Sequence, residues 1–131
     1  MRPADRDRFD ALLQQEIAAL PAGVLDLLEE VPVVAEDKPA PDVLSEFGID
    51  PADADELCGL HSGRAITERG VGDPPELPNV VMLYREGIVA HAGGWAVGDE
   101  AVAEEIRITL LHEIGHEFGL DEDDLERLGY A

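Results

Sequence analysis

Two histidines and a glutamate in the last quarter of the chain have the spacing of a metal site. Residues 112–116 read HEIGH, so His112 and His116 lie four positions apart, with Glu113 next to the first of them. On an α-helix, side chains four residues apart project from the same face, where two imidazoles can bind one zinc ion. Glu113 lies at the flank of that face, where a carboxylate can take a proton from a water molecule at the metal. The pattern predicts metal-assisted hydrolysis with Glu113 as the general base.

A catalytic zinc site needs a third protein ligand and an open position for water. Gly119 lies three residues after His116, and a glycine at the end of a helix commonly adopts the left-handed conformation that turns the chain. Such a reversal brings the acidic residues at 121–124 back toward the imidazoles. The third ligand is therefore expected in this run.

Within the acidic run, the positions differ in what else they can do. Asp121 is suited to cap a short following helix, with Asp124 in its first turn, and this favours Glu122 as the ligand. The spacing from His112 to position 122 matches HExxHxxGxxH, in which the last residue is the third ligand. We predict His112, His116 and Glu122 as metal ligands, with a neighbouring aspartate as the alternative to Glu122.

A long helix is predicted to position these residues. Residues 99–118 contain no proline, begin with acidic side chains and show apolar residues at helical spacing. One side carries Val102, Ile106, Leu110, Ile114 and Phe118, and a neighbouring stripe carries Ile108 and Leu111. This pattern predicts a well-buried helix.

Weaker signals indicate the remaining elements. Apolar spacing predicts an amphipathic helix over about residues 5–20, closed by Pro21, and the β-branched run Val31–Val34 predicts a strand. Several prolines make residues 37–55 a surface connection, with at most one short helical turn around residues 43–47.

The run Val80–Tyr84 is the clearest strand pattern in the chain, and Arg85–Gly87 is interpreted as a turn after it. A substrate peptide can pair with the exposed edge of a sheet. Val80–Tyr84 is predicted to lie mainly in the core, and it is also the candidate edge strand for an extended substrate.

The chain resembles the minimal zincin-like metallopeptidases, a family of small bacterial proteins. The resemblance is strongest from Val102 to Tyr130, including EEIRITLLHEIGHEFGLDEDDLERLGY, and weaker in DELCGLHSGRAITERG and PNVVMLYR. Members generally show HExxHxxGxxD, so Glu122 stands where they have aspartate. The resemblance implies a compact α+β zincin-like domain, in which a small mixed sheet packs against the active-site helix and an N-terminal helix. It also implies zinc as the cofactor and peptidase activity.

The length of the chain favours a minimal form of such a site. Only 15 residues follow His116, which leaves little room for a ligand on a distant helix. The only methionines are Met1 and Met82, so a Met-turn beneath the metal is excluded. Tyr130 is predicted to take over that supporting role.

Composition limits the partners and the compartment. The chain has 131 residues, consistent with one domain over 1–131, and 30 acidic against 9 basic residues give a net charge of -21. Nucleic acid and anionic membranes would be repelled, so we expect a peptide or unfolded protein as substrate. The start of the chain lacks the apolar core of a signal peptide, which predicts a cytoplasmic protein. A homodimer is a further expectation, because so short a chain has few residues to wall off a cleft.

The remaining candidate residues have simpler interpretations. The single Cys58 is predicted to be a small buried side chain and not a nucleophile. His61 and His91 have no ligand spacing and are interpreted as loop or packing residues, although His91 could line the cleft. The alternative to an enzyme is a catalytically silent metal-binding or acidic protein-interaction module, in which Glu113 would have no role as a base.

Overall fold

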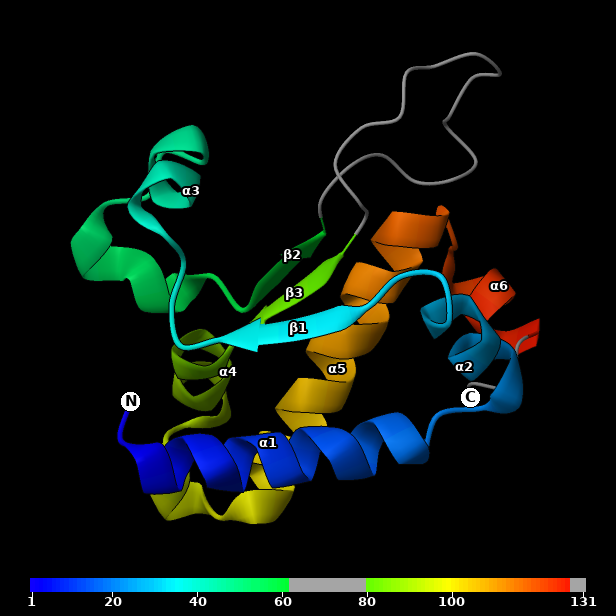
Figure 1. The fold of residues 1–131 in the computed structure, drawn as a ribbon, viewed down its shortest axis with the longest axis horizontal. Coiled ribbons are helices and arrows are strands. Elements are labelled where there is room, and N and C mark those ends of the chain that lie inside the picture. Colours follow the sequence, from blue (N-terminus) through cyan, green and yellow to red (C-terminus); the bar gives the residue numbers. More distant parts are fainter. Residues whose placement is uncertain (62–79, 128–131) are drawn as a thin grey trace.

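Helices surround a small three-stranded sheet in the computed structural model, which describes residues 1–61 and 80–127 (Figure 1). The strands are β1 (Val33–Glu36), β2 (Gly59–His61) and β3 (Val81–Tyr84). β3 is central, with β1 parallel on one side and β2 antiparallel on the other. The predicted α+β fold with a mixed sheet is confirmed.

Helices form most of the remaining described chain. Their bounds are α1 (Pro3–Ala18), α2 (Ala22–Leu28), α3 (Pro41–Glu46), η1 (Pro51–Glu56), α4 (Arg85–Ala92), η3 (Trp95–Val97), α5 (Asp99–Phe118) and α6 (Glu122–Arg127), where η denotes a 3-10 helix. α1 and α3 both have proline in their first turn, where its fixed φ favours the helix and its missing N–H is not needed. Within the described residues, no helix is both long and apolar enough to cross a membrane.

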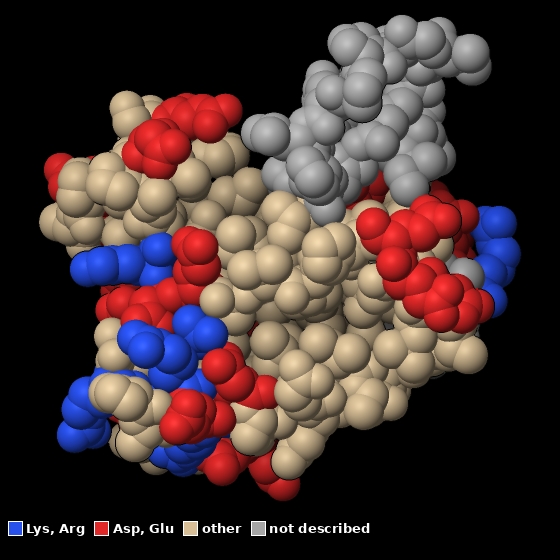
Figure 2. Space-filling model, viewed as in Figure 1, with Lys and Arg blue, Asp and Glu red and all other residues tan. Residues whose placement is uncertain are grey.

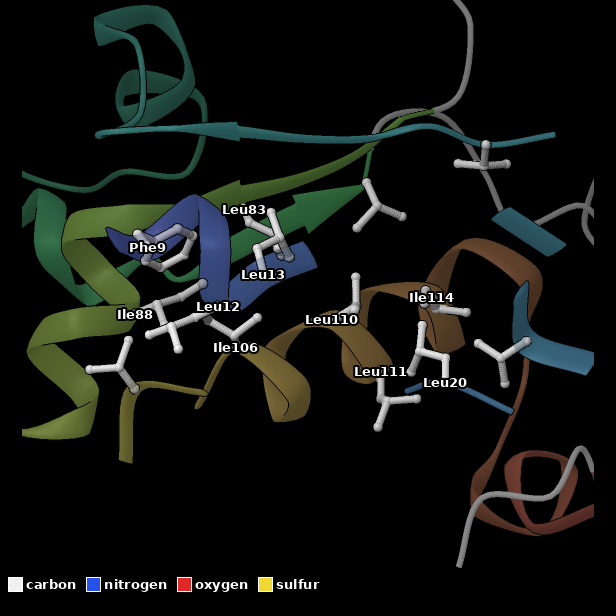
Figure 3. Packing of buried hydrophobic residues seen from close by; sticks show 14 of the residues in the cluster. Phe9, Leu12, Leu13, Leu20, Leu83, Ile88, Ile106, Leu110, Leu111 and Ile114 are labelled. Atoms are coloured by element: carbon white, nitrogen blue, oxygen red, sulfur yellow. The ribbon is translucent and has the colours of Figure 1, made fainter. Parts of the chain in front are cut away.

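α5 is the helix around which the other elements pack. It contacts α1, α4, η3 and the strands β2 and β3, and it has the predicted bounds. All five residues of its predicted apolar side are buried. Figure 3 shows Leu110 and Ile106 of α5 near Leu83 of β3, Ile88 of α4 and Leu13 of α1. Each such side chain contributes about 1.5 to 3 kcal/mol when fully buried, so this packing holds α5 against the sheet.

The structure confirms the predicted N-terminal helix and the strand at Val81–Tyr84. The prediction of at most one short helical turn in residues 37–55 is wrong, because the 3-10 helix η1 begins at Pro51 in addition to α3. The structure also shifts the start of one strand. β1 begins at Val33, two residues later than predicted, although the carbonyl of Pro32 still accepts a hydrogen bond from the Val81 N–H at 3.0 Å. Proline has no N–H to donate to a strand ladder, which is the physical reason for the later start.

The predicted turn at Arg85–Gly87 is wrong, because α4 begins at Arg85 directly after β3. Gly87 is buried inside this helix, and a Cβ atom there would collide with the backbone carbonyl of Leu57. The glycine therefore permits a close approach between α4 and the segment before β2, and it does not form a turn.

Five charged groups meet where α1, β1 and α4 come together, and we call them the Asp37 cluster: the α-ammonium of Met1, Arg6, Asp10, Asp37 and Arg85. Arg6 Nη2 lies 2.6 Å from Asp37 Oδ2, and Arg85 binds both oxygens of Asp10 at 2.9 and 3.1 Å. The hydrogen bond from Arg6 is the largest cause that lowers the pKa of Asp37 to about 2. Figure 2 shows basic side chains gathered beside acidic ones near the N-terminal end of α1.

Candidate metal centre and cleft

The structure brings His112, Glu113 and His116 together on one face of α5. One potential ligand atom from each residue lies within 4.8 Å of the others, and the two imidazole centroids are 4.1 Å apart. Both histidines are exposed, whereas Glu113 is only 6% exposed. Imidazole nitrogens and a carboxylate oxygen are donors that zinc accepts, so these residues fit a zinc ion.

Gly119 ends α5 three residues after His116, as predicted. Its φ is 65°, in the left-handed region that glycine adopts without steric cost. The Leu120 N–H donates to the Gly115 carbonyl at 2.7 Å, and the Gly119 N–H donates to the His116 carbonyl at 3.4 Å. These two bonds form a Schellman motif, which satisfies the last carbonyls of the helix and reverses the chain beside the imidazoles.

Asp121 and Asp124 cap α6 reciprocally, which confirms the predicted roles of both. The Asp124 N–H donates to Asp121 Oδ1 at 2.8 Å, and the Asp121 N–H donates to Asp124 Oδ2 at 3.0 Å. The hydrogen bond from the Asp124 backbone is the largest cause that lowers the pKa of Asp121. Glu122 is the first residue of α6, but its side chain and Tyr130 lie outside what the structure describes. The third ligand and the role of Tyr130 stay predictions.

A hollow of about 370 Å³ runs beside the histidines between α5 and the segment that leads into β2. We call it the α5–β2 cleft. It is lined by Glu56, Leu57, Cys58, Gly59, Glu105, Ile108, Thr109, His112 and Glu113. The cleft therefore includes one predicted metal ligand and the predicted general base.

Gly59 allows β2 to lie directly on α5 at this point. A Cβ atom there would be 2.9 Å from the Met82 carbonyl oxygen, 3.0 Å from Thr109 Cγ2 and 3.2 Å from Glu113 Cγ. Any side chain would push the strand away from the helix, so glycine at this position brings the sheet edge to the general base.

Comparison with family models matches residues 28–130 to a zincin-like metallopeptidase. The chain belongs to this family. A search of curated proteins found no match. The matched range contains the whole sheet, α5 and the HEIGH residues, and it begins after α1.

Val81, Leu83 and Tyr84 are buried, so the prediction that this strand lies in the core is confirmed. The alternative, that Val80–Tyr84 is the substrate-pairing edge of this zincin-like fold, is wrong. β3 is the central strand and is hydrogen-bonded on both sides. The edge strand beside α5 is β2, which pairs only with β3 among the described strands. A strand with both edges occupied cannot accept a peptide, so β2 is the strand that remains available next to the site.

Cys58 lies in the cleft wall and is chemically quiet. Burial, followed by the nearby charges of Glu105 and Glu113, raises the pKa of its thiol to about 11. The His91 Nδ1 atom lies 2.9 Å from the Gly87 carbonyl, which can only accept a hydrogen bond, so Nδ1 carries the proton. The Cys58 sulfur, 3.1 Å from the same nitrogen, accepts from it. These contacts agree with the prediction that Cys58 is not a nucleophile, although its side chain is half-buried and not fully buried as predicted. His91 is exposed on α4 and is not among the described residues that line the cleft.

Sequence reasoning did not find the other cleft residues. Ile108 was expected beside Leu111 on a buried stripe of α5, yet it is 49% exposed and lines the cleft. Glu105 lies seven residues before His112, and Thr109 lies four before Glu113, so helical periodicity from the HEIGH residues could have found both. Glu56 and Gly59 come from a distant segment, and no local signal places them here. The side chain of His61, the last residue of β2, lies outside the description.

Proposed function

We propose that this protein is a zinc-dependent peptidase in which His112, His116 and Glu122 hold the metal and Glu113 is the general base. The observation that carries the proposal is the convergence of His112, Glu113 and His116 at the edge of a cleft, in a chain that belongs to the zincin-like metallopeptidase family. A structural zinc site is closed by four protein ligands, whereas this one adjoins an open hollow.

The histidines and Glu113 have different roles in the proposed reaction. Zinc, when bound, would polarise the scissile carbonyl and make a water molecule acidic near neutral pH. Glu113 takes the proton of the attacking water and passes it to the leaving amine. Its carboxylate is almost fully buried but lies within 4.8 Å of the histidine donor atoms, so it is held close to the reacting centre. The two imidazoles must be neutral to hold the metal, so zinc affinity falls at acidic pH.

The capping of α6 supports Glu122 as the third ligand. Asp121 and Asp124 each use one carboxylate oxygen to accept a backbone N–H in the cap, which holds both side chains at the start of α6 and makes them less free to turn toward a metal than their neighbours. That leaves Glu122 and the exposed Asp123 in the acidic run. We favour Glu122 because its spacing from His116 matches the third-ligand position of the HExxHxxGxxH pattern.

The substrate is an extended peptide or an unfolded segment that pairs with the edge of β2. This strand lies against α5 beside Glu113 through the contact at Gly59. Backbone pairing with β2 would hold the peptide along the cleft, so that a scissile bond can reach the general base.

Glu113→Gln is the test of catalysis. Zinc-loaded wild type, Glu113→Gln and Glu104→Gln are incubated with a mixture of synthetic decapeptides, and the products are identified by mass spectrometry. Glu104 is an exposed carboxylate of the same helix that is absent from the cleft lining, so its variant is the matched control. We expect a loss of about 10²- to 10⁴-fold for Glu113→Gln alone, with zinc still bound. Cleavage that is equal in all three proteins, or absent from the wild type, would favour a silent metal-binding or interaction module.

Glu122→Ala tests the third ligand, with Asp123→Ala as its neighbour control. We expect zinc affinity to fall by at least about tenfold in the first variant and to stay within twofold of wild type in the second. The reverse pattern, measured by competition with a chelating dye, would assign the ligand to Asp123.

A further inference from the structure

The α5–β2 cleft extends well beyond the metal centre along α5. Glu105 and His112 are seven residues apart on the helix, so about 11 Å of cleft separates them along the axis. Between them, Ile108 turns an apolar side chain toward solvent, and Leu57 lines the same hollow. This end of the cleft therefore combines apolar walls with a carboxylate.

The charged side chains that line the cleft in the described part of the chain all have one sign. They are Glu56, Glu105 and Glu113, and no described lysine or arginine joins them. Within the described part of the chain, Glu56 and Glu105 form no ion pair, although Arg107 of the same helix pairs with Glu104 outside the cleft. Burial first, and then the nearby charges of Glu105 and Glu113, raise the pKa of the Cys58 thiol in the cleft wall.

We propose that the end of the cleft between Glu56, Glu105, Ile108 and Leu57 is a specificity pocket for an arginine or lysine side chain of the substrate. The proposal rests on the proposed peptidase function, because the hollow is continuous with the general base. A long basic side chain would lay its apolar stem along Ile108 and Leu57 and place its cation at Glu105, with Glu56 at the exposed rim.

The distance along α5 fixes where the basic residue lies in the peptide. An extended chain advances about 3.3 Å per residue, so about 11 Å corresponds to roughly three residues. The pocket therefore selects a basic residue about three positions from the scissile bond, on one side of it only.

A local pocket differs from the general attraction of a chain with charge -21. The field of the whole surface attracts any cationic peptide, is weakly sensitive to the position of the cation and is screened by salt within about 8 Å at physiological ionic strength. A pocket that holds the cation at the Glu105 carboxylate selects one position and depends on that carboxylate.

The test uses binding and does not require turnover. Tetrapeptides with a zinc-binding hydroxamate at one end carry either arginine or its neutral isostere citrulline at each position in turn. Their affinities for the zinc-loaded full chain are measured by calorimetry at about 0.15 M salt. The proteins are wild type, Glu105→Gln and the control Glu104→Gln. A parallel digestion of a decapeptide library with the wild type records the residues around each cleaved bond.

We expect one position at which arginine binds about tenfold more tightly than citrulline in wild type and in Glu104→Gln. The preference should fall below about twofold in Glu105→Gln, and the library should show basic residues enriched at the corresponding position. Equal affinities at every position, a preference that survives Glu105→Gln, or no hydroxamate binding at all would overturn the pocket. Binding with the arginine preference but without cleavage would overturn the peptidase function alone, and cleavage without a basic preference would overturn the pocket alone.

Discussion

The Asp37 cluster and the α5–β2 cleft are both rich in carboxylates, but these carboxylates differ in whether arginine side chains lie beside them. In the cluster, Asp37 and Asp10 face Arg6 and Arg85 at hydrogen-bond distance. In the cleft, the lining residues that the structure describes include no lysine or arginine. The chain has only 9 basic residues, and two of them, Arg6 and Arg85, form the ion pairs that connect α1, α4 and the end of β1.

The difference separates carboxylates that stabilise the fold from carboxylates that are free for a ligand. Paired groups at the cluster gain hydrogen bonds and lower the pKa of Asp37, so their contribution is to stability. The cleft carboxylates Glu56 and Glu105 have no such partner among the described residues, so their field is available to a bound cation.

Gly87→Ala is expected to have the largest effect, because α4 connects the two regions. The helix carries Arg85 of the Asp37 cluster, and Gly87 lies against the backbone of Leu57 in the cleft wall. Helix propensity alone predicts a gain of up to about 1 kcal/mol, whereas the collision predicts a loss of about 3 kcal/mol in the free energy of unfolding. Urea titration distinguishes the two, with the exposed Ala90→Gly as a control for the helix. A stabilised Gly87→Ala variant would contradict the close approach.

Gly59→Ala is expected to damage the cleft and leave the cluster intact. The added methyl group would lie 3.2 Å from Glu113 Cγ and 3.0 Å from Thr109 Cγ2, so β2 or the general base must shift. We expect kcat/KM to fall by about tenfold or more, because small displacements of catalytic groups are costly. Zinc affinity should stay within twofold of wild type, since neither histidine is displaced. Unchanged kcat/KM would show that the contact between β2 and α5 does not position Glu113.

Asp37→Asn is expected to have the smallest effect of the three substitutions. In contrast to Gly59→Ala, it should lower the stability of the fold and leave catalysis unchanged. The pKa of Asp37 is about 2 in the folded chain against an ordinary value of 3.8, so its charge stabilises the fold above pH 4. Because the ion pairs are partly exposed, we expect a loss of about 1 kcal/mol at pH 7, with kcat/KM unchanged. The difference from wild type should shrink as the pH falls from about 4 to about 2, and the exposed Asp53→Asn serves as the control. A constant difference over that range would contradict the role of the ionised carboxylate.

Local patterns in the sequence predict the parts of this protein that local physics determines. The spacing of apolar residues and Gly119 determine α5, and the four-residue spacing brings His112 and His116 to one face. The reciprocal cap of Asp121 and Asp124 is likewise a local signal that the structure confirms.

Features that depend on contacts between distant segments could not be predicted in this way. The order of the strands depends on long-range pairing, so the run Val80–Tyr84 gave no sign that it is central and not an edge. Gly87 and Gly59 are needed for close approaches to other segments, and a glycine in a sequence is more readily interpreted as a turn. Glu56 and Glu105 meet in the cleft through the packing of η1 on α4 and of α4 and β2 on α5, contacts between segments far apart in the sequence.

Zinc binding measured by calorimetry tests the central claim most directly. Metal-free wild type, His116→Ala and the control His91→Ala are titrated with zinc at pH 7.5, each with its fold checked by circular dichroism. The account predicts one tight site per chain in wild type and in His91→Ala, and at least a hundredfold weaker binding in His116→Ala. Weak binding in wild type, or equal binding in all three folded proteins, would contradict a metal centre at His112 and His116.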